Sequence, residues 1–232
     1  MNNNNGINRI AMSGTYSTGK TVTTEALSHL TGIGRTYAKT MRELLPLHFP
    51  GKKLEECNIF DLYELGMLRF VERVSNEGGE KKSYITDGSV IHEYIYGMSR
   101  MNYGLAINNE HPIKKFMTNI KLLPHLRVYK GISERYGNIV KKYAKSHYDI
   151  FIHLPIEFPM VKDGHRPYSE EFREMCDRKI LNTLEEMEIP YIIAKGTIEE
   201  RLKTIVETLN LETVTSYEEA ARVGLEKAKK NA

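Results

Sequence analysis

The residues with the clearest chemistry form one short segment near the N-terminus: Gly14, Thr15, Tyr16, Ser17, Thr18, Gly19, Lys20 and Thr21. This segment fits the pattern G-x-x-x-x-G-K-[ST] of a phosphate-binding loop. Its glycines let the backbone wrap closely around a phosphate, and its turned N–H groups make an anion site. We expect Lys20 to reach the β- and γ-phosphates of a nucleotide and the Thr21 hydroxyl to ligate Mg²⁺.

The sequence on either side of this segment favours the same interpretation. Residues 9–13 are typical of a short buried strand, and residues 21–30 of a helix whose N-terminus adds to the anion site. The alternative is a chance glycine-rich turn, which ordinary residue frequencies produce in about 1% of chains of this length. The motif in its context therefore predicts that the chain binds ATP together with Mg²⁺.

A second candidate is Asp87, which directly follows a predicted strand over residues 83–86. In α/β folds ligands bind at the carboxyl ends of the strands. A carboxylate there can hold Mg²⁺ or accept a proton from an attacking hydroxyl. The alternative is a structural turn, because Asp-Gly-Ser is also good turn chemistry. We assign Asp87 both to catalysis and to the metal.

Three arginines, Arg166, Arg173 and Arg178, lie in or after a predicted loop over residues 156–167. Arginines on such a loop can close over a nucleotide and neutralise charge that develops on the transferred phosphoryl group. Arg173 and Arg178 could instead pair with acidic neighbours on a solvated helix. We assign Arg166 and Arg173 to catalysis, alongside Lys20 and Asp87.

Two further features leave their roles open. The basic segment 127–147 could bind an anionic substrate, although such a run is more often a solvated helix face. Tyr94, Tyr96 and Tyr103 could stack on a substrate ring, but at helical spacing aromatic residues more often pack a core.

Hydrophobic periodicity predicts strands that alternate with helices along the whole chain. We therefore expect an α/β three-layer sandwich: a five-stranded parallel sheet with helices on both faces. The predicted strands cover residues 8–13, 33–37, 83–86, 148–154 and 190–194. The predicted helices cover residues 21–30, 39–45, 53–76, 90–103, 113–123, 133–146, 169–188, 197–209 and 216–230.

Length and composition are those of a soluble globular domain. The chain has 232 residues, a net charge of +3 and a hydrophobic fraction of 41%. The small charge argues against nucleic acid as a partner, and no apolar run is long enough to span a membrane. We expect a disordered tail over residues 1–8, one domain over residues 9–212 and a helical appendage over residues 213–232. The expected location is the cytoplasm, and a homodimer stays open.

The order of motifs resembles a known family. It runs from the phosphate loop through Thr86-Asp87, Asp163-Gly164-His165-Arg166 and Ile189-Pro190-Tyr191 to Gly196-Thr197-Ile198-Glu199-Glu200-Arg201. This order is similar to that of the AAA-type ATPase and kinase family that includes the nicotinamide riboside kinase domain of NadR. The resemblance implies a nucleoside- and nucleotide-kinase-like fold with a lid that carries Arg166 and Arg173.

The resemblance also implies that Gly196 and Thr197 lie near the adenine of the nucleotide. Family members often have a glutamate in the segment that matches residues 35–39, near the acceptor. Thr36 occupies that place here, so the resemblance does not name the acceptor.

These features favour a small-molecule kinase that transfers the γ-phosphoryl group of ATP to a hydroxyl of a nucleoside-like or other polar metabolite. The alternative is a nucleotide-dependent switch or partner-binding ATPase without a small acceptor. A polynucleotide kinase is a third hypothesis, which requires the basic segment 127–147 to face the site. A GTPase is disfavoured, since the chain lacks an Asn-Lys-x-Asp motif and its last strand runs into Ala194-Lys195-Gly196.

Overall fold

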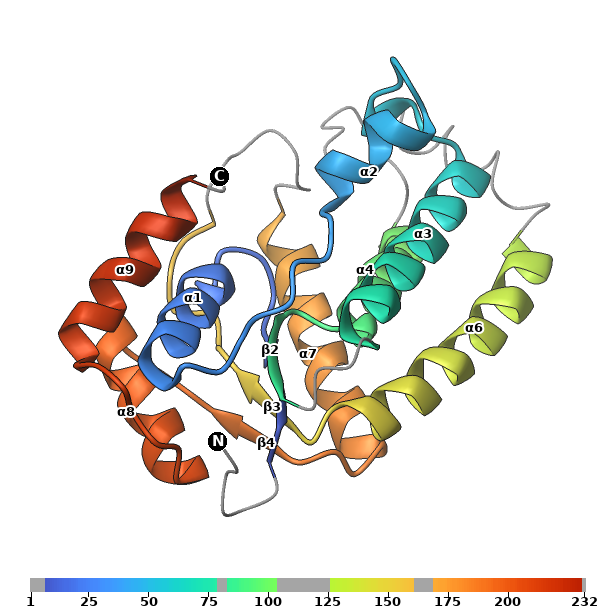
Figure 1. The fold of residues 1–232 in the computed structure, drawn as a ribbon. Helices are drawn as coiled ribbons and strands as arrows, with labels where there is room; N and C mark the ends of the chain where they lie inside the picture. The colour runs from blue at the N-terminus through green and yellow to red at the C-terminus, as the bar shows by residue number, and fades with distance from the viewer. Residues whose placement is uncertain (1–6, 79–82, 104–125, 161–168, 231–232) are drawn as a thin grey trace.

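The fold is an α/β sandwich built around a parallel sheet (Figure 1). The computed structural model describes residues 7–78, 83–103, 126–160 and 169–230. The sheet consists of β1 (Arg9–Ser13), β2 (Tyr84–Asp87), β3 (Ile150–His153) and β4 (Tyr191–Ile193). The strand order is β2-β1-β3-β4, and every pair is parallel. Strand direction and layering confirm the predicted fold class.

The number of strands is a correction, because the described sheet has four strands and not five. The segment expected as a second strand, residues 33–37, makes only an isolated parallel bridge between Arg35 and Ile85. The backbone N–H groups of Ile85 and Thr36 donate to the carbonyls of Gly34 and Ile85, respectively. Two hydrogen bonds beside β2 are too few to extend the ladder into a strand.

One face of the sheet is covered by α1 (Lys20–Thr31), α8 (Ile198–Leu209) and α9 (Tyr217–Lys230). Ile10 and Met12 of β1 point into this layer together with Leu27 and Leu202, and all four side chains are fully buried. The C-terminal helix α9 packs closely along α1 (Figure 1). Gly224 makes this possible, since a Cβ there would lie 2.7 Å from the Ala26 Cβ.

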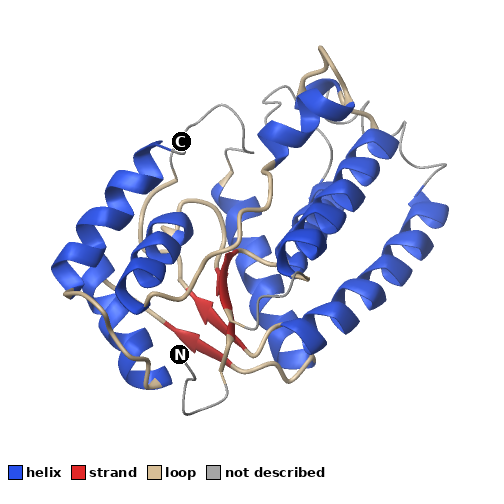
Figure 2. Cartoon of the chain, in the orientation of Figure 1, coloured by secondary structure: helices blue, strands red, loops and turns tan. Residues whose placement is uncertain are grey.

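The opposite face is covered by α4 (Val90–Tyr103), α6 (Leu126–His147) and α7 (Glu170–Glu186). Ala11 of β1 and Phe151 of β3 point into this layer, because side chains alternate between the two faces of a strand. The helices α2 (Met41–His48) and α3 (Ile59–Glu77) continue the same side beyond the sheet, with α3 against α4 (Figures 1 and 2).

Three helix boundaries differ from the sequence expectation. The helix expected over residues 133–146 begins earlier, at Leu126. The helix expected over residues 39–45, before Pro46, continues through this proline to His48. The single helix expected over residues 53–76 is divided into a 3₁₀ turn, Leu54–Glu56, and α3. Asn58 separates them because its side chain accepts hydrogen bonds from the N–H groups of Phe60 and Asp61. The helix expected over residues 113–123 lies outside the described residues.

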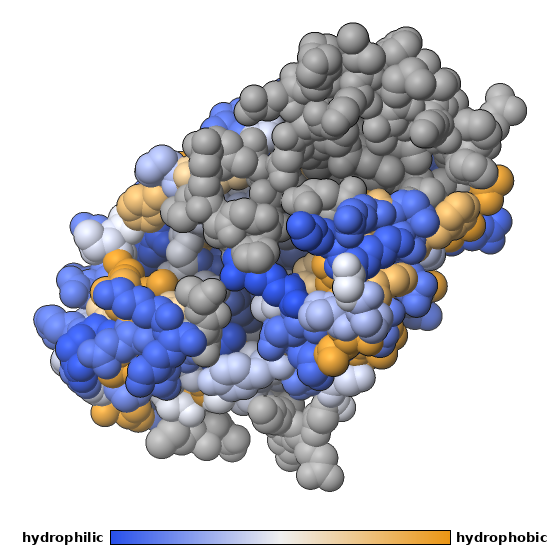
Figure 3. Space-filling model, turned by 90° about the horizontal axis from the view of Figure 1, so that it is seen from above, coloured by the Kyte–Doolittle hydropathy of each residue, from blue (hydrophilic) through white to orange (hydrophobic). Residues whose placement is uncertain are grey.

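The carboxyl ends of all four strands meet at one edge of the sheet. The chain enters the sheet at β1, moves to β2 on one side and later to β3 on the other. In open α/β sheets this change of direction opens a crevice at the strand ends, where ligands bind. Figure 3 looks down on this edge and shows hydrophilic side chains at its centre. In the described part of the chain, no helix combines the length and hydropathy that a membrane span needs.

Candidate functional site

The phosphate-loop segment leaves β1 and enters α1 through residues with left-handed or otherwise unusual backbone angles. Gly14 has a φ of 127° and Gly19 a φ of 87°, and Ser17 adopts 57°. A Cβ on Gly14 would lie 2.5 Å from the carbonyl oxygen of Leu154 and 2.8 Å from the Thr18 hydroxyl. Both the backbone conformation and the lack of space therefore require glycine at position 14.

Inside the loop, polar groups converge on the carbonyl of Thr15. The Lys20 ammonium donates to this oxygen at 2.5 Å, and the Thr18 hydroxyl donates to it at 3.0 Å. Lys20 is thus held over the loop by a neutral acceptor. A phosphate oxygen carries more charge than a carbonyl and would compete for the same ammonium.

The two residues predicted to share the metal, Thr21 and Asp87, are in direct contact. The Thr21 hydroxyl donates to Asp87 Oδ2 at 2.6 Å. Strand register explains the contact, because Asp87 at the end of β2 pairs with Met12 of β1, just before the loop. A hydroxyl and a carboxylate are hard oxygen donors of the kind that Mg²⁺ prefers, so these residues fit that ion.

A buried histidine is hydrogen-bonded to the backbone at the start of the loop. His92 of α4 accepts a hydrogen bond at Nε2 from the Gly14 N–H at 3.3 Å, and its Nδ1 lies 2.8 Å from the Ser89 hydroxyl. Acceptance at Nε2 implies that Nδ1 carries the proton of the neutral ring. Burial and the nearby charge of Lys20 lower the pKa of His92 well below its ordinary value. The neutral ring can therefore keep its acceptor on the loop.

Ser13 connects this histidine to a second one. The Ser13 hydroxyl lies 3.3 Å from His92 Nε2 and 3.2 Å from His153 Nδ1. His153 Nε2 in turn lies 3.6 Å from Asp177 of α7. A chain of buried polar groups thus runs beneath the loop from α4 to α7.

Aromatic rings pack against the outer part of the loop. Tyr16 stacks on Tyr96 of α4, with 4.6 Å between the ring centroids. Its ring also stacks with that of Phe172 of α7, at a centroid distance of 6.5 Å. The Tyr96 hydroxyl donates to the Gly14 carbonyl at 3.3 Å. These contacts tie the loop to two helices on the opposite side of the sheet from α1.

The three arginines in and after the predicted loop differ in their surroundings. Arg166 lies outside the described residues. Arg173 is fully buried near the start of α7, where it donates to the Phe158 carbonyl at 2.9 Å and pairs with Glu170 at 3.2 Å. Its Nε and Nη2 have no hydrogen-bond partner among the described groups. Arg178 is exposed and lies 3.7 Å from Glu174, as expected for a solvated helix face.

Gly196 and Thr197, predicted to lie near adenine, form the entry to α8 after β4. Gly196 has a φ of 87°, and the Thr197 hydroxyl caps α8 by accepting from the Glu200 N–H. The Gly196 N–H donates to both carboxylate oxygens of Glu157 at 3.1 Å. The same carboxylate pairs with Arg201 at 2.8 Å. This loop is therefore connected to the segment after β3.

On the other side of Asp87, an acidic residue of α4 lies between two arginines of α3. Glu93 pairs with Arg69 and, at 3.1 Å, with Arg73. Arg73 also donates to the Asp87 carbonyl at 3.1 Å, which fixes the end of β2. Burial by itself would raise the pKa of Glu93, but the two arginine charges outweigh burial and hold that pKa at about 2.

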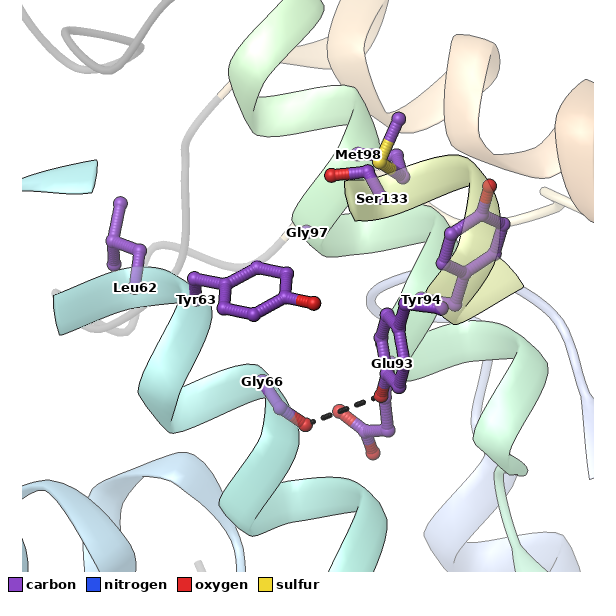
Figure 4. Close-up of a pocket in the computed structure, with 9 residues that line it drawn as sticks. Leu62, Tyr63, Gly66, Glu93, Tyr94, Gly97, Met98 and Ser133 are labelled. Atoms are coloured by element: carbon purple, nitrogen blue, oxygen red, sulfur yellow. Dashed lines mark hydrogen bonds between the residues drawn. The ribbon is translucent and has the colours of Figure 1, made fainter. Parts of the chain in front are cut away.

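Glu93 belongs to a pocket between α3, α4 and α6 (Figure 4). The pocket is lined by Leu62, Tyr63, Gly66, Glu93, Tyr94, Gly97, Met98, Ser133 and Tyr136. The Tyr136 hydroxyl donates to the Gly66 carbonyl at 3.4 Å. The cavity volume is about 20 Å³, which is room for about one water molecule.

The structure thus brings together the loop, Thr21 and Asp87, and it adds residues that sequence reasoning missed. His92 and Glu93 follow Asp87 by five and six residues on a predicted helix, but no sequence spacing showed that one faces the loop and the other the pocket. The basic segment of α6 packs against α4 and lies on the far side of the molecule from α1 (Figure 1). Tyr94 lines the pocket, whereas Tyr96 supports the loop.

The model of the AAA domain family matches residues 9–201, which include the phosphate loop and every strand. The chain belongs to this family. No curated protein matches the chain. The family match confirms the resemblance that the motif order indicated.

Solved structures of similar fold include a deoxyadenosine kinase and NadR. Deoxyadenosine kinase from M. mycoides with bound dATP superposes with a TM-score of 0.57 at 17% identity, over 87% of this AAA-domain chain and 98% of that one. NadR in complex with NR has a TM-score of 0.51 at 14% identity, over 90% of this chain and 53% of NadR. NadR with NAD and AMP-PNP has a TM-score of 0.53 at 15% identity. At such identities the likeness shows a shared fold.

Proposed function

We propose that this protein is an ATP- and Mg²⁺-dependent kinase that transfers the γ-phosphoryl group to a hydroxyl of a nucleoside-like metabolite. The observation that carries the proposal is the contact of the Thr21 hydroxyl with Asp87 at 2.6 Å, beside Lys20 and the glycine loop. It joins a phosphate cradle to a carboxylate, the combination that phosphoryl transfer requires.

In this proposal the loop from Gly14 to Thr21 holds the phosphates of ATP, with Lys20 on the β- and γ-phosphates. Thr21 and Asp87 would hold Mg²⁺, which supplies charge neutralisation for the triphosphate. Arg166 and Arg173 are proposed to stabilise charge on the transferred group, and Gly196 and Thr197 to lie along the adenine. Structures of this fold have been solved with dATP and with AMP-PNP bound, which supports a nucleotide as a ligand of this chain.

The acceptor is proposed to bind between α3, α4 and α6, where the pocket of about 20 Å³ would have to widen to admit it. Tyr63, Tyr94 and Tyr136 offer ring faces for a planar base, and Glu93 offers acceptor oxygens for its N–H or O–H groups. Arg73 donates both to Glu93 of the pocket and to the Asp87 carbonyl, so one side chain connects the pocket to the strand end that carries Asp87. The acceptor hydroxyl would then lie within reach of the Asp87 carboxylate, which can accept its proton.

The direct test is ADP release from Mg·ATP, with and without a panel of nucleosides, nucleotides, vitamins and sugars. We expect one nucleoside-like compound to stimulate release and to gain a phosphoryl group by mass. A low rate that no compound changes would contradict the kinase proposal and favour a switch or partner-dependent ATPase.

The matched variant for this assay is Lys20→Ala. Loss of the Lys20 ammonium should abolish ATP binding or turnover, because this charge lies over the loop and is the one expected to neutralise the β- and γ-phosphates. Lys203→Ala, which removes an exposed lysine of α8, is the control and should behave as wild type. Normal binding and turnover by Lys20→Ala would contradict the phosphate-loop assignment.

A further inference from the structure

A buried arginine of α8, Arg201, connects the phosphate loop to the Gly196 loop. Only 2% of its side chain is exposed. One end of the guanidinium donates from Nη1 to the Thr18 carbonyl at 2.7 Å, and the other donates from Nη2 to Glu157 at 2.8 Å. Glu157 then accepts from the Gly196 N–H at 3.1 Å. Three segments that are far apart in sequence thus meet at one side chain.

The bond to Thr18 has a geometric consequence for the loop. A trans peptide is planar, so its carbonyl and its following N–H point in opposite directions. Because Arg201 holds the Thr18 carbonyl, the Gly19 N–H must point away from Arg201. The Arg201 Nη1 also lies 3.0 Å from where a Cβ of Gly19 would be, so the guanidinium fills the space behind this peptide. Arg201 therefore orients one N–H donor of the anion site.

Glu157 keeps Arg201 in this place. Burial would raise the pKa of the Glu157 carboxyl, but the hydrogen bond from Arg201, helped by the Gly196 N–H, lowers that pKa below its ordinary value. The guanidinium also lies over the Phe158 ring, 5.4 Å from its centroid. A planar guanidinium can donate from its two ends to the loop and to the carboxylate at once, with a fixed distance between its two donors that a lysine ammonium does not provide.

We propose that Arg201 and Glu157 act as a positioning pair that preorganises the phosphate loop for polyphosphate and couples it to the Gly196 loop. Neither side chain needs to touch the reacting atoms. The inference rests on the proposed function in one respect: the ligand of the loop is a polyphosphate. It adds two residues to which the proposed reaction assigns no part.

The test measures binding of ATP and of inorganic tripolyphosphate by calorimetry, well below the melting temperature of each variant. We expect Arg201→Gln to bind both ligands about tenfold more weakly, because one fixed N–H donor loses its orientation. Glu157→Gln should weaken tripolyphosphate binding about threefold, although within the described residues its carboxylate accepts from Arg201 and the Gly196 N–H and not from the phosphate loop. The double variant should lose no more than Arg201→Gln alone.

The control is Arg222→Gln, which removes an arginine that pairs with Glu219 and Glu226 on the exposed face of α9 and should leave both affinities unchanged. If Arg201→Gln does not fold, Arg201→Lys takes its place and should show an intermediate loss. Folded variants with wild-type affinity for tripolyphosphate, or losses that add in the double variant, would overturn the positioning pair alone. A wild-type protein that binds neither ligand would overturn the proposed function and the pair with it.

Discussion

At the scale of single residues, the contact between Thr21 and Asp87 decides how the site is interpreted. A threonine hydroxyl that donates to a carboxylate at 2.6 Å brings two oxygen ligands together at the mouth of an anion-binding loop. Asp-Gly-Ser could have been only a turn, and Gly88 does adopt a φ of 84° there. The turn and the carboxylate are both present, and the turn places the carboxylate beside the loop.

Asp87→Asn tests the proposed role of this carboxylate. Turnover of Mg·ATP should fall by about two orders of magnitude, because the amide neither ligates Mg²⁺ as strongly nor accepts a proton. Affinity for ATP without Mg²⁺ should hold or rise, since a negative charge beside the phosphates is removed. Steady-state kinetics and calorimetry check both parts. Glu207→Gln on the exposed side of α8 is the control, and wild-type turnover by Asp87→Asn would remove Asp87 from the mechanism.

At the scale of elements, α4 links the two halves of the site. Its first turns place His92 toward the phosphate loop and Glu93 toward the pocket of α3 and α6. Successive residues on a helix point about 100° apart, so neighbours in sequence can serve different sites. One helix therefore sets the distance between the nucleotide and the proposed acceptor.

The buried His92 gives this element a pH dependence. Its pKa in the folded protein lies well below the ordinary value of 6.5, so the fold holds it neutral. The unfolded chain takes up a proton below pH 6.5, and the free energy of unfolding should therefore decrease as the pH falls from 6.5 toward 5, by up to about 1.4 kcal/mol per pH unit.

Urea unfolding at pH 7.5, 6.5, 5.5 and 5 measures this slope. His92→Gln should flatten it, because the group that titrates in the unfolded chain is gone. His48→Gln at the exposed end of α2 is the matched control. The window ends above pH 4.5, where protonation of Glu93 begins to contribute in the unfolded chain. If the free energy of unfolding changed with pH by the same amount in His92→Gln and in the wild type, groups other than His92 would account for the pH dependence.

At the scale of the whole molecule, α9 is part of the packed structure around α1. Lys227 of α9 lies 3.9 Å from the buried Glu25 of α1, and Glu25 also pairs with Arg35. Because α1 begins at Lys20, the helix that carries the phosphate loop is supported from outside by α9. We propose that residues 213–232 stabilise the domain without contributing to the chemistry.

A pair of glycine substitutions tests this packing. Gly224→Ala should destabilise the protein by about 1–3 kcal/mol, because the added Cβ would lie 2.8 Å from the Val22 carbonyl oxygen. Gly131→Ala makes the same change on α6, where no atom lies within 4 Å of the added Cβ. This variant should stabilise the protein by about 0.4–1 kcal/mol. Thermal unfolding should separate them, at about 2–4 °C per kcal/mol. Equal shifts in both variants would contradict close packing of α9 on α1.

The amino-acid sequence by itself determined the phosphate loop and the alternation of strands and helices. These features are local: the loop is defined by glycines at fixed spacing, and each strand or helix by the period of its own apolar residues. Local signals also placed Asp87 at a strand end, where its carboxylate was expected.

Only the tertiary structure decided which distant residues meet. The contacts of Arg201 with Thr18, of His92 with Gly14 and of Glu93 with two arginines of α3 depend on how helices pack across the sheet. Sequence spacing carries no information on such packing, since it is set by burial and shape over the whole molecule. For the same reason, residues 33–37 had the pattern of a strand but form only an isolated bridge to Ile85, because the length over which a segment pairs depends on how it lies beside its neighbour and not on its own pattern.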